Sequence, residues 1–319
     1  MRHVVVFTDE SIRAEAAQLL APTCDVRVLR AYPSEETLAD ACRDADAILA
    51  RLGVVTRRVI ERAPKLRIVA RHGVGVDAVD LDAATARGVV VTTTGSENAA
   101  AVAEYTFALL LALVRHVVRA DAGMRQGEWD RDPLVGGELD GATMGVVGYG
   151  AIGRRVARQA TGFGMRVLAC DPSATAIDRG TTLVPLDELL AQSDVVSLHT
   201  RLNADNVHLI DERAFELMKP GACLVNTARG ELVDEAALIA ALARGTLRGA
   251  ALDTYEREPL AKESPLRHMP NVVLSPHVAG QTEAALRRVG IAAAQCILDE
   301  LAGRTPRFVY NPDAYRNRP

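Results

Sequence analysis

Short apolar runs alternate with amphipathic stretches along the first hundred residues of the chain. The apolar runs, most of them rich in β-branched residues, predict strands, and the stretches between them have helical spacing with Ser, Thr or Asp near their starts. The predicted strands are Val4–Phe7, Val26–Leu29, Ala47–Ala50, Arg67–Ala70 and Val89–Thr92, and the predicted helices are Ser11–Leu20, Ser34–Arg43, Thr56–Arg62 and Asp80–Arg87. This alternation is typical of a parallel sheet with crossover helices.

The same alternation begins again after about residue 100, with strands predicted near residues 143–148, 165–170, 194–199, 222–226, 248–253 and 271–275. A final helical stretch, Thr282–Leu301, and a tail through Asn311 follow, and we expect them to pack back on the first domain. The sequence therefore predicts an α/β protein with two domains that each contain a parallel sheet. We expect residues 1–98 plus 284–319 to form a discontinuous domain and residues 99–283 to form a domain inserted within it.

Length and composition agree with two soluble domains. The chain has 319 residues, of which 49% are apolar and 24% charged, with a net charge of −4. This charge and the absence of Lys/Arg blocks argue against a nucleic-acid partner. The most apolar helical stretch, Ala99–Val114, carries Glu104 and stops at Arg115, so we expect no membrane span.

The cysteines and histidines exclude further classes. The five cysteines are scattered without a CxxC pair, which favours free thiols in a reducing cytoplasm. The seven histidines show neither HxxxH nor a cluster with cysteine, and we expect no metal. The first residues, an apolar run followed by Asp9 and Glu10, predict a strand and not a signal peptide.

A glycine motif marks the start of the second alternation. The strand Thr143–Val147 leads into Gly148-Tyr149-Gly150-Ala151-Ile152-Gly153, and the helix predicted from Ile152 to Phe163 follows. The glycines allow a tight turn, close approach of backbone N–H groups to a pyrophosphate, and close helix packing. Asp171 closes the next strand, where a carboxylate accepts both ribose hydroxyls of NAD. No arginine follows it until Arg179, so NAD is favoured over NADP.

Motifs from end to end resemble the D-isomer-specific 2-hydroxyacid dehydrogenase family, which includes phosphoglycerate dehydrogenases. Besides the glycine motif they are Arg71-His72-Gly73-Val74-Gly75-Val76-Asp77, Asn98 with Val102-Ala103-Glu104, Leu217-Met218-Lys219-Pro220-Gly221-Ala222, Asn226-Thr227-Ala228-Arg229-Gly230, Asp253, Glu258-Pro259 and Ser275-Pro276-His277. The resemblance implies hydride transfer between NAD(H) and a 2-hydroxy or 2-oxo acid such as phosphoglycerate, glyoxylate or hydroxypyruvate. It also implies two Rossmann-like domains, with an NAD-binding domain inserted into a flavodoxin-like substrate-binding domain and the active site between them.

The resemblance assigns catalysis to Arg229, Glu258 and His277. An imidazole gains or loses a proton near neutral pH, and a neighbouring glutamate raises its pKa and orients it. The planar fork of an arginine holds a carboxylate or ketone oxygen with two hydrogen bonds. Taken singly, the three have plainer explanations as a surface arginine, a solvated glutamate and a capping histidine.

The remaining site residues also follow from the resemblance. The expected cofactor-binding residues are Gly148, Gly150, Ala151, Ile152, Gly153, Asp171, His199, Thr200, Thr227, Ala228, Arg229, Asp253, His277 and Gly280, with Thr227 and Ala228 near the nicotinamide ribose and Asp253 on the carboxamide. The expected substrate-binding residues are Arg51, Val74, Gly75, Arg229 and His277. A plain strand-to-helix turn remains the alternative for the loop at residues 72–75.

Several points stay open at this stage. Arg201 replaces a proline usual in the family; we expect it to point to solvent, with a role at a phosphate or the substrate mouth as the alternative. A phosphite dehydrogenase and an NAD-sensing corepressor-type binding protein are the alternative functions. A long helix from about Asn98 to Arg119 is expected to build a homodimer interface, as in the family. The sequence does not name the substrate.

Overall fold

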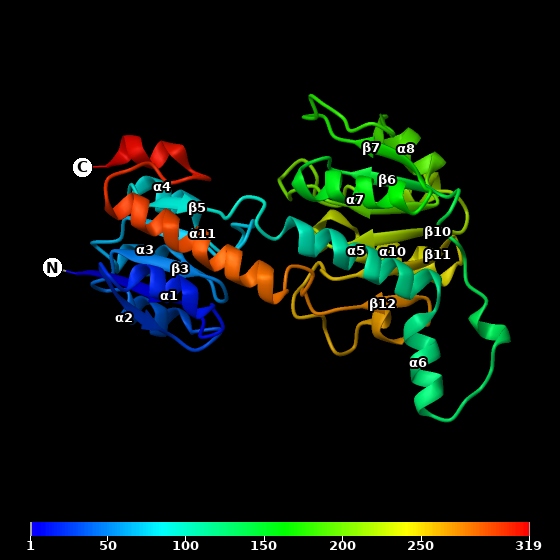
Figure 1. Ribbon diagram of the computed structural model, residues 1–319, viewed down its shortest axis with the longest axis horizontal. Coiled ribbons are helices and arrows are strands. Elements are labelled where there is room, and N and C mark those ends of the chain that lie inside the picture. The colour runs from blue at the N-terminus through cyan, green and yellow to red at the C-terminus, as the bar shows by residue number, and fades with distance from the viewer. Residues whose placement is uncertain (1, 319) are drawn as a thin grey trace. The chain divides into compact units, whose positions relative to one another are not determined.

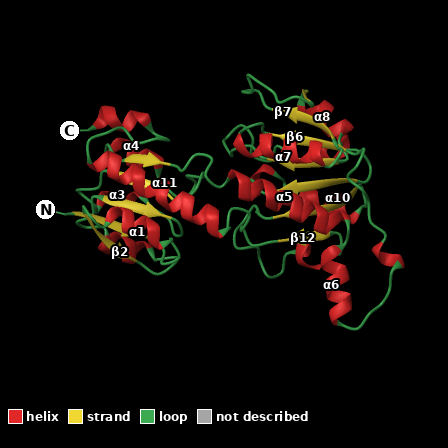
Figure 2. Ribbon diagram, viewed as in Figure 1, coloured by secondary structure: helices red, strands yellow, loops and turns green. Residues whose placement is uncertain are grey.

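The computed structural model describes residues 2–318, so the two outermost residues of the predicted discontinuous domain lie outside the described part. The chain divides into two compact units. Unit 1 consists of Met1–Asn98 and Gln281–Pro319, and unit 2 consists of Ala99–Gly280. In each unit helices flank a twisted sheet (Figure 1, Figure 2), which confirms the α/β class.

Unit 1 contains a five-stranded sheet with the strand order β2-β1-β3-β4-β5. All its strand pairs are parallel. The strands are β1 (His3–Phe7), β2 (Cys24–Val28), β3 (Ala47–Ala50), β4 (Ile68–Arg71) and β5 (Val90–Thr92). The order of the strands reverses between β1 and β3. In open parallel sheets, ligands bind beyond the carboxyl ends of the strands at such a point.

The helices of unit 1 cover both faces of this sheet. Alternate strand residues point to opposite faces, so Val5 and Phe7 pack with α1 and α11, whereas Val6 packs with α2, α3 and α4. The helices are α1 (Ala14–Leu20), α2 (Glu35–Ala41), α3 (Arg57–Glu61), α4 (Leu81–Ala86) and α11 (Glu283–Leu301), followed by the 3₁₀ helix η4 (Pro312–Asn317).

Polar side chains begin four of these helices where the sequence predicts them. The side chains of Ser34, Thr56, Asp80 and Thr282 each accept a hydrogen bond from the backbone N–H three residues later. Such caps replace partners that the first helical turn lacks, and each contributes about 1 kcal/mol.

The C-terminal tail pairs with the edge of the unit 1 sheet. Thr92 and Val309 form an antiparallel bridge, and Tyr310 donates its N–H to the carbonyl of Val91 at 2.8 Å. The side chain of Asn311 accepts from the N–H of Val91 at 2.7 Å and donates to the carbonyl of Val89 at 3.0 Å. The tail therefore satisfies backbone groups that an edge strand would leave unpaired.

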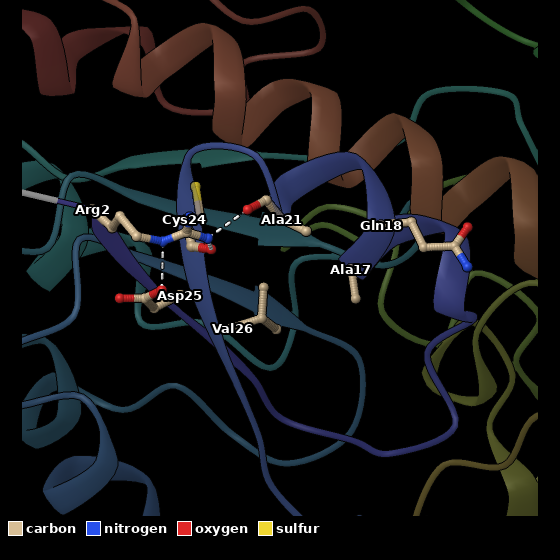
Figure 3. Close-up of a pocket in the computed structure, with 7 residues that line it drawn as sticks. All are labelled: Arg2, Ala17, Gln18, Ala21, Cys24, Asp25 and Val26. Atoms are coloured by element: carbon tan, nitrogen blue, oxygen red, sulfur yellow. Dashed lines mark hydrogen bonds and ion pairs between the residues drawn. The ribbon is translucent and has the colours of Figure 1, made fainter.

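A surface pocket of about 450 Å³ lies beside α1 and β2 of unit 1 (Figure 3). Its charged residues are already paired, because Arg2 donates to the carboxylate of Asp25 at 2.6 Å and to the carbonyl of Ala21. None of the residues predicted to bind cofactor or substrate lines it, and it offers no unpaired charge to a ligand.

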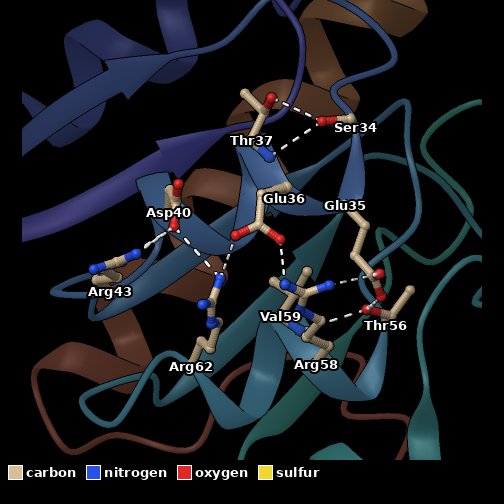
Figure 4. Close-up of polar contacts among 10 residues, drawn as sticks. All are labelled: Ser34, Glu35, Glu36, Thr37, Asp40, Arg43, Thr56, Arg58, Val59 and Arg62. Atoms are coloured by element: carbon tan, nitrogen blue, oxygen red, sulfur yellow. Dashed lines mark hydrogen bonds and ion pairs between the residues drawn. The ribbon is translucent and has the colours of Figure 1, made fainter.

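An exposed network of charges joins α2 to α3 on the opposite face of unit 1 (Figure 4). Glu36 receives hydrogen bonds from Arg58 and from Arg62, the latter at 2.6 Å, and Asp40 receives one from Arg43 at 2.7 Å. Solvent screens such exposed pairs, so they add little to stability. The network supports the packing of the two helices and takes no part in the site described below.

Unit 2 contains a seven-stranded parallel sheet with the order β12-β11-β10-β9-β6-β7-β8. The strands are β6 (Thr143–Val147), β7 (Arg166–Cys170), β8 (Thr181–Leu183), β9 (Val195–Leu198), β10 (Ala222–Asn226), β11 (Leu247–Leu252) and β12 (Val272–Leu274). The order reverses between β6 and β9. The residues that follow these two strands are those of the glycine motif and of the segment from His199.

Two helical layers bury the faces of this sheet. Helices α5 (Ala99–Val114) and α7 (Ala151–Gly162) pack on one face, and α8 (Leu186–Gln192), α9 (Glu212–Leu217) and α10 (Glu235–Ala243) pack on the other. The 3₁₀ helices η1 (Asp132–Leu134), η2 (Gly230–Leu232) and η3 (Pro265–His268) lie in the connections.

The long helix expected from Asn98 to Arg119 is two helices. It ends at Val114, and α6 (Val117–Arg125) continues at an angle of 63°. The break lies at His116, whose φ of +54° is left-handed and cannot continue a right-handed helix. Within residues 2–318 no single helix meets the length and hydropathy criteria for a membrane span; the bent pair of α5 and α6 meets them by length and composition alone.

Candidate functional site

The glycine motif forms a tight turn between β6 and α7. Gly148 has a φ of +91°, and a Cβ there would lie 2.5 Å from the N of Thr200, so only glycine fits against the end of β9. A Cβ on Gly153 would lie 2.0 Å from the carbonyl oxygen of Gly148, which requires glycine for close helix packing. A Cβ on Gly150, by contrast, would meet no atom within 4 Å.

The space beside Gly150 and the start of α7 suit a bound pyrophosphate. Gly150 is the N-cap of α7 and no side chain caps the helix, so its first N–H groups, including those of Ala151 and Ile152, lack side-chain partners. Free N–H groups and the positive end of the helix dipole attract anions. The residues of this turn therefore fit the dinucleotide that the sequence predicts.

Asp171 stands at the carboxyl end of β7, and its carboxylate turns toward the glycine motif. It accepts hydrogen bonds from the N–H of Tyr149 at 2.7 Å and from the N–H of Ser173 at 2.8 Å. The structure thus brings Asp171 and the glycine turn together, as the sequence predicts for an acid that binds the adenosine ribose.

His199 and Thr200 follow β9 and border the glycine turn. Burial lowers the pKa of His199 to about 3, so its ring is neutral. Nε2 of this ring lies 2.8 Å from Oγ of Ser197, and its buried Nδ1 has no hydrogen-bond partner within the described chain. An unpartnered buried nitrogen beside the turn is consistent with a polar ligand there. The side chain of Arg201 is exposed to solvent.

Arg229 is presented by a short loop after β10. The buried side chain of Asn226 accepts from the N–H of Ala228 at 3.0 Å and donates to the carbonyl of Arg229 at 2.7 Å. Nη1 of Arg229 donates to the carbonyl of Ala228 at 2.6 Å. A Cβ on Gly230 would lie 1.8 Å from the carbonyl carbon of Tyr255, so glycine lets the chain that leads to Glu258 cross close to Arg229.

His277 and Glu258 form a direct pair. Nδ1 of His277 lies 2.8 Å from Oε2 of Glu258, whose other oxygen accepts from the N–H of Tyr255 at 3.2 Å. The Glu258 hydrogen bond raises the pKa of His277 against the effect of burial and of the nearby Arg229 charge. Burial tends to raise the pKa of Glu258, but hydrogen bonding and charge from His277, with a contribution from Arg229, hold it below its ordinary value.

The turn that carries His277 is held by Asp253. The carboxylate of Asp253 is fully buried and accepts from Oγ of Ser275 at 2.6 Å, from N of Val278 at 2.9 Å and from N of Ala279 at 2.8 Å. These bonds support a left-handed backbone at His277, whose φ is +53°. Burial raises the pKa of Asp253. The structure therefore shows the Asp253 carboxylate hydrogen-bonded to the turn that carries His277. Gly280 follows this turn directly and is half-buried.

Within unit 1, Arg51 follows β3 at the reversal of strand order. Its Nη1 donates to Oδ2 of Asp9 at 2.5 Å, and its N–H donates to the hydroxyl of Thr8 at 3.0 Å. The loop with Val74 and Gly75 follows β4, where Nε of Arg71 donates to the carbonyl of Gly75 at 3.0 Å. Burial and the Arg51 charge lower the pKa of His72 to about 4, so this histidine is neutral.

Sequence reasoning did not name several of the residues that hold the site in place. Ser275 and Asn226 stand inside quoted motifs, and this position was the only signal for them. No motif in the sequence marks Asp9 or Tyr255 as residues of the site. Tyr255 donates its hydroxyl to the carbonyl of Ser275 at 2.9 Å, and burial raises its pKa to about 12. Within residues 2–318, no group of three or more His, Cys, Asp or Glu side chains is arranged to hold a metal ion.

The strand order of unit 2 and its glycine turn define a dinucleotide-binding Rossmann fold. The family model described as "D-isomer specific 2-hydroxyacid dehydrogenase, NAD binding domain" matches residues 107–279. The chain belongs to the D-isomer specific 2-hydroxyacid dehydrogenase family.

Similar proteins carry several activities in their names. The chain is 39% identical over 313 residues to D-3-phosphoglycerate dehydrogenase of Methanocaldococcus jannaschii, covering 97% of this chain and 59% of that protein. It is 40% identical over 334 residues to glyoxylate reductase of Aeropyrum pernix, covering 100% and 99%. The structure of an acyclic imino acid reductase in complex with NADPH and D-Arg superposes with a TM-score of 0.88 at 29% identity, covering 97% and 99%.

The chain thus spans a little over half the length of the phosphoglycerate dehydrogenase and almost the full length of the glyoxylate reductase.

Proposed function

We propose that this protein is an NAD-dependent dehydrogenase that transfers a hydride between NAD(H) and a small 2-hydroxy or 2-oxo acid. The observation that carries the proposal is the 2.8 Å pair of His277 and Glu258, whose pKa values both respond to the nearby charge of Arg229. A proton donor beside a fixed cation is what reduction of a 2-oxo acid needs from the protein.

The cofactor supplies the hydride when it is bound. In this proposal Gly148, Gly150 and Gly153 and the first N–H groups of α7 hold its pyrophosphate, and Asp171 accepts from its adenosine ribose. The set is completed by His199, Thr200, Thr227, Ala228, Arg229, Asp253, His277 and Gly280, with Asp253 at the carboxamide. The carboxylate of Asp171 repels a 2′-phosphate, which favours NAD over NADP.

His277 handles the proton. Because Nδ1 is bonded to Glu258, the proton that the imidazolium can release is the one on Nε2. During reduction His277 donates this proton to the ketone oxygen, and during oxidation it takes the hydroxyl proton. Its raised pKa keeps a larger fraction protonated at neutral pH, which favours reduction.

Arg229 and the loops of unit 1 hold the substrate. Arg229 binds the carboxylate or the ketone oxygen with its planar fork. We assign Arg51, Val74 and Gly75 to the substrate as well, the latter two through backbone N–H groups. Pairing with the buried Asp9, at 2.5 Å, fixes the Arg51 guanidinium and supports this assignment.

A substrate screen tests the proposal. The purified protein is mixed with NADH or NADPH and with glyoxylate, hydroxypyruvate or 3-phosphohydroxypyruvate, and the loss of absorbance at the nicotinamide band is followed. We expect turnover of at least one acid, with NADH preferred. His277→Ala is the matched inactive control. Oxidation of phosphite by NAD without turnover of any 2-oxo acid would overturn the substrate class. Cofactor binding without any turnover would support the NAD-sensing alternative.

The face of α6 supports self-association. None of its side chains is buried, and Val117, Val118 and Met124 are more than half exposed. We propose that a second copy of the chain covers this surface in a cytoplasmic homodimer. Sedimentation of wild type against a Val118→Glu variant tests it, and a wild type that stays monomeric at micromolar concentration would refute it.

A further inference from the structure

Two threonine hydroxyls meet beneath the loop that presents Arg229. Thr106 lies in α5, and Thr227 follows β10 immediately before Ala228 and Arg229. Oγ1 of Thr106 is 3.0 Å from Oγ1 of Thr227, and relative exposure is 0% for Thr106 and 8% for Thr227. The contact therefore joins a buried helix to a loop in the candidate cofactor site.

The direction of this hydrogen bond follows from proton counting. Oγ1 of Thr106 also donates to the carbonyl oxygen of Val102 at 2.8 Å. A carbonyl oxygen only accepts, and a hydroxyl carries a single proton. The proton of Thr106 is thus committed to Val102, and the proton between the two threonines belongs to Thr227.

A bond from threonine to the carbonyl four residues earlier is common in helices and carries no argument by itself. What matters is its effect on Thr227. With its only proton directed at Thr106, the hydroxyl of Thr227 offers only lone pairs to any other group.

The backbone of the loop is held independently of Thr106. Asn226, which is 1% exposed, closes the loop through its bonds to the N–H of Ala228 and the carbonyl of Arg229. Loss of the Thr106 hydroxyl therefore leaves the loop tethered. It changes only the direction in which the Thr227 hydroxyl points.

We propose that Thr106 is a positioning residue that makes Thr227 a dedicated hydrogen-bond acceptor for a donor on the nicotinamide half of the cofactor, either a ribose hydroxyl or the carboxamide NH₂. This inference rests on the proposed function, which places Thr227 at the cofactor. The proposed role gives Thr106 a function at the cofactor site, whereas the apolar residues of α5 pack in the core.

The test compares Thr106→Val, which keeps the shape of the side chain, with Thr106→Ser, which keeps the hydroxyl. The dissociation constant of NADH is measured from its own fluorescence, without turnover. Thr106→Val frees Thr227 to present its proton to the ligand donor, so we expect a roughly 3- to 10-fold weaker NADH complex. Thr106→Ser should bind within about two-fold of wild type, since its donor and acceptor are the same.

Repeating the comparison in a Thr227→Val protein distinguishes a positioning role of Thr106 from structural damage. In a Thr227→Val protein the acceptor is already absent, so adding Thr106→Val should not weaken NADH binding further. Equal weakening in both backgrounds, or an unchanged dissociation constant in the single variant, would overturn the inference. If Thr106→Val lowers the melting temperature, Thr106→Ala, which has no β-branch to accommodate, replaces it in the same comparison. A wild type that does not bind NADH would instead refute the proposed function.

Discussion

The hydroxyl of Ser275 donates to the carboxylate of Asp253 across 2.6 Å, two residues before His277 in the chain. The same carboxylate accepts hydrogen bonds from the N–H groups of Val278 and Ala279, so Asp253 holds the turn on both sides of the histidine. The backbone of His277 lies in a left-handed conformation that L-residues rarely adopt. Its placement therefore depends on Asp253 more than on its own local preference.

Replacing Asp253 should affect both stability and catalysis. Asp253→Ala leaves the buried N–H of Ala279 and the partly buried N–H of Val278 without this partner, and an unsatisfied buried group costs about 1–3 kcal/mol. Displacement of His277 should then lower kcat by about 100-fold. Urea unfolding and NADH-dependent reduction measure the two effects. Ser275→Ala removes a single donor and should give a smaller loss in both, whereas an active, fully stable Asp253→Ala would contradict the proposed clamp.

Removing the charge of Glu258 should move the pH profile. The Glu258 hydrogen bond raises the pKa of His277, so Glu258→Gln should lower this pKa and shift the alkaline limit of reduction toward acid. The stability that the pair contributes is complete below the ordinary histidine pKa and is lost as pH rises through the raised one. Profiles of kcat/KM for wild type and variant measure the shift.

The pair of His208 and Glu256 provides the matched control for this shift. Oε1 of Glu256 lies 2.9 Å from Nε2 of His208, so Glu256→Gln removes a histidine partner that plays no proposed part in catalysis. Its pH profile should match that of the wild type. Identical profiles for Glu258→Gln and wild type would remove Glu258 from the proton-transfer step.

Asp171 should decide the choice of cofactor. Asp171→Ala removes the negative charge that repels a 2′-phosphate and also the acceptor for the N–H of Tyr149. We expect the ratio of kcat/KM for NADPH to that for NADH to rise by about ten-fold, equivalent to 1.4 kcal/mol. Asp121→Asn is the control, because it removes an exposed charge of unit 2 whose partner is Arg125 on the same helix. An unchanged ratio would take Asp171 out of the ribose site.

Two glycines of the motif should respond in opposite ways. Gly150→Ala places a methyl group in open space at an ordinary φ of −80°, so the protein should unfold at nearly the wild-type urea concentration. That methyl group fills the space proposed for the pyrophosphate and should abolish NADH binding. Gly153→Ala puts a Cβ 2.0 Å from the Gly148 oxygen and should destabilise unit 2 itself. Unimpaired NADH binding by Gly150→Ala would place the cofactor elsewhere.

Most strands and helices could be predicted because their patterns are local. The run Ala47–Ala50 is fully buried and rich in aliphatic residues, and the structure confirms it as β3 with the same bounds. Strand β8, Thr181–Leu183, was not predicted, because it is a three-residue edge strand with two exposed positions and shows no periodicity. The break at His116 was also missed, because the apolar pattern continues through Val117 and Val118, which are exposed.

The candidate site likewise contains residues that the sequence predicts and residues that it does not. Motifs indicated His277, Glu258 and Arg229, because these residue types are suited to proton transfer and to anion binding. Other contacts of the candidate site are tertiary, and a single sequence does not reveal them: Asp9, which pairs with Arg51, is 42 positions away from it. Thr106 and Thr227 are 121 apart. Their side chains meet only because parallel strands and crossover helices bring distant segments to one edge of a sheet.

The C-terminal tail that pairs with β5 has a consequence for the order of folding. During synthesis, β1 to β5 emerge first. The sheet face formed by Val5 and Phe7 stays uncovered until α11 emerges, and the N–H of Val91 stays unpaired until Asn311 emerges. All of unit 2, Ala99–Gly280, emerges from the ribosome before either partner does. The second unit in the sequence can therefore complete its core on the ribosome while the first remains open. Chains that are truncated at residue 281 and released from the ribosome should accordingly resist protease in unit 2 and be cleaved in unit 1.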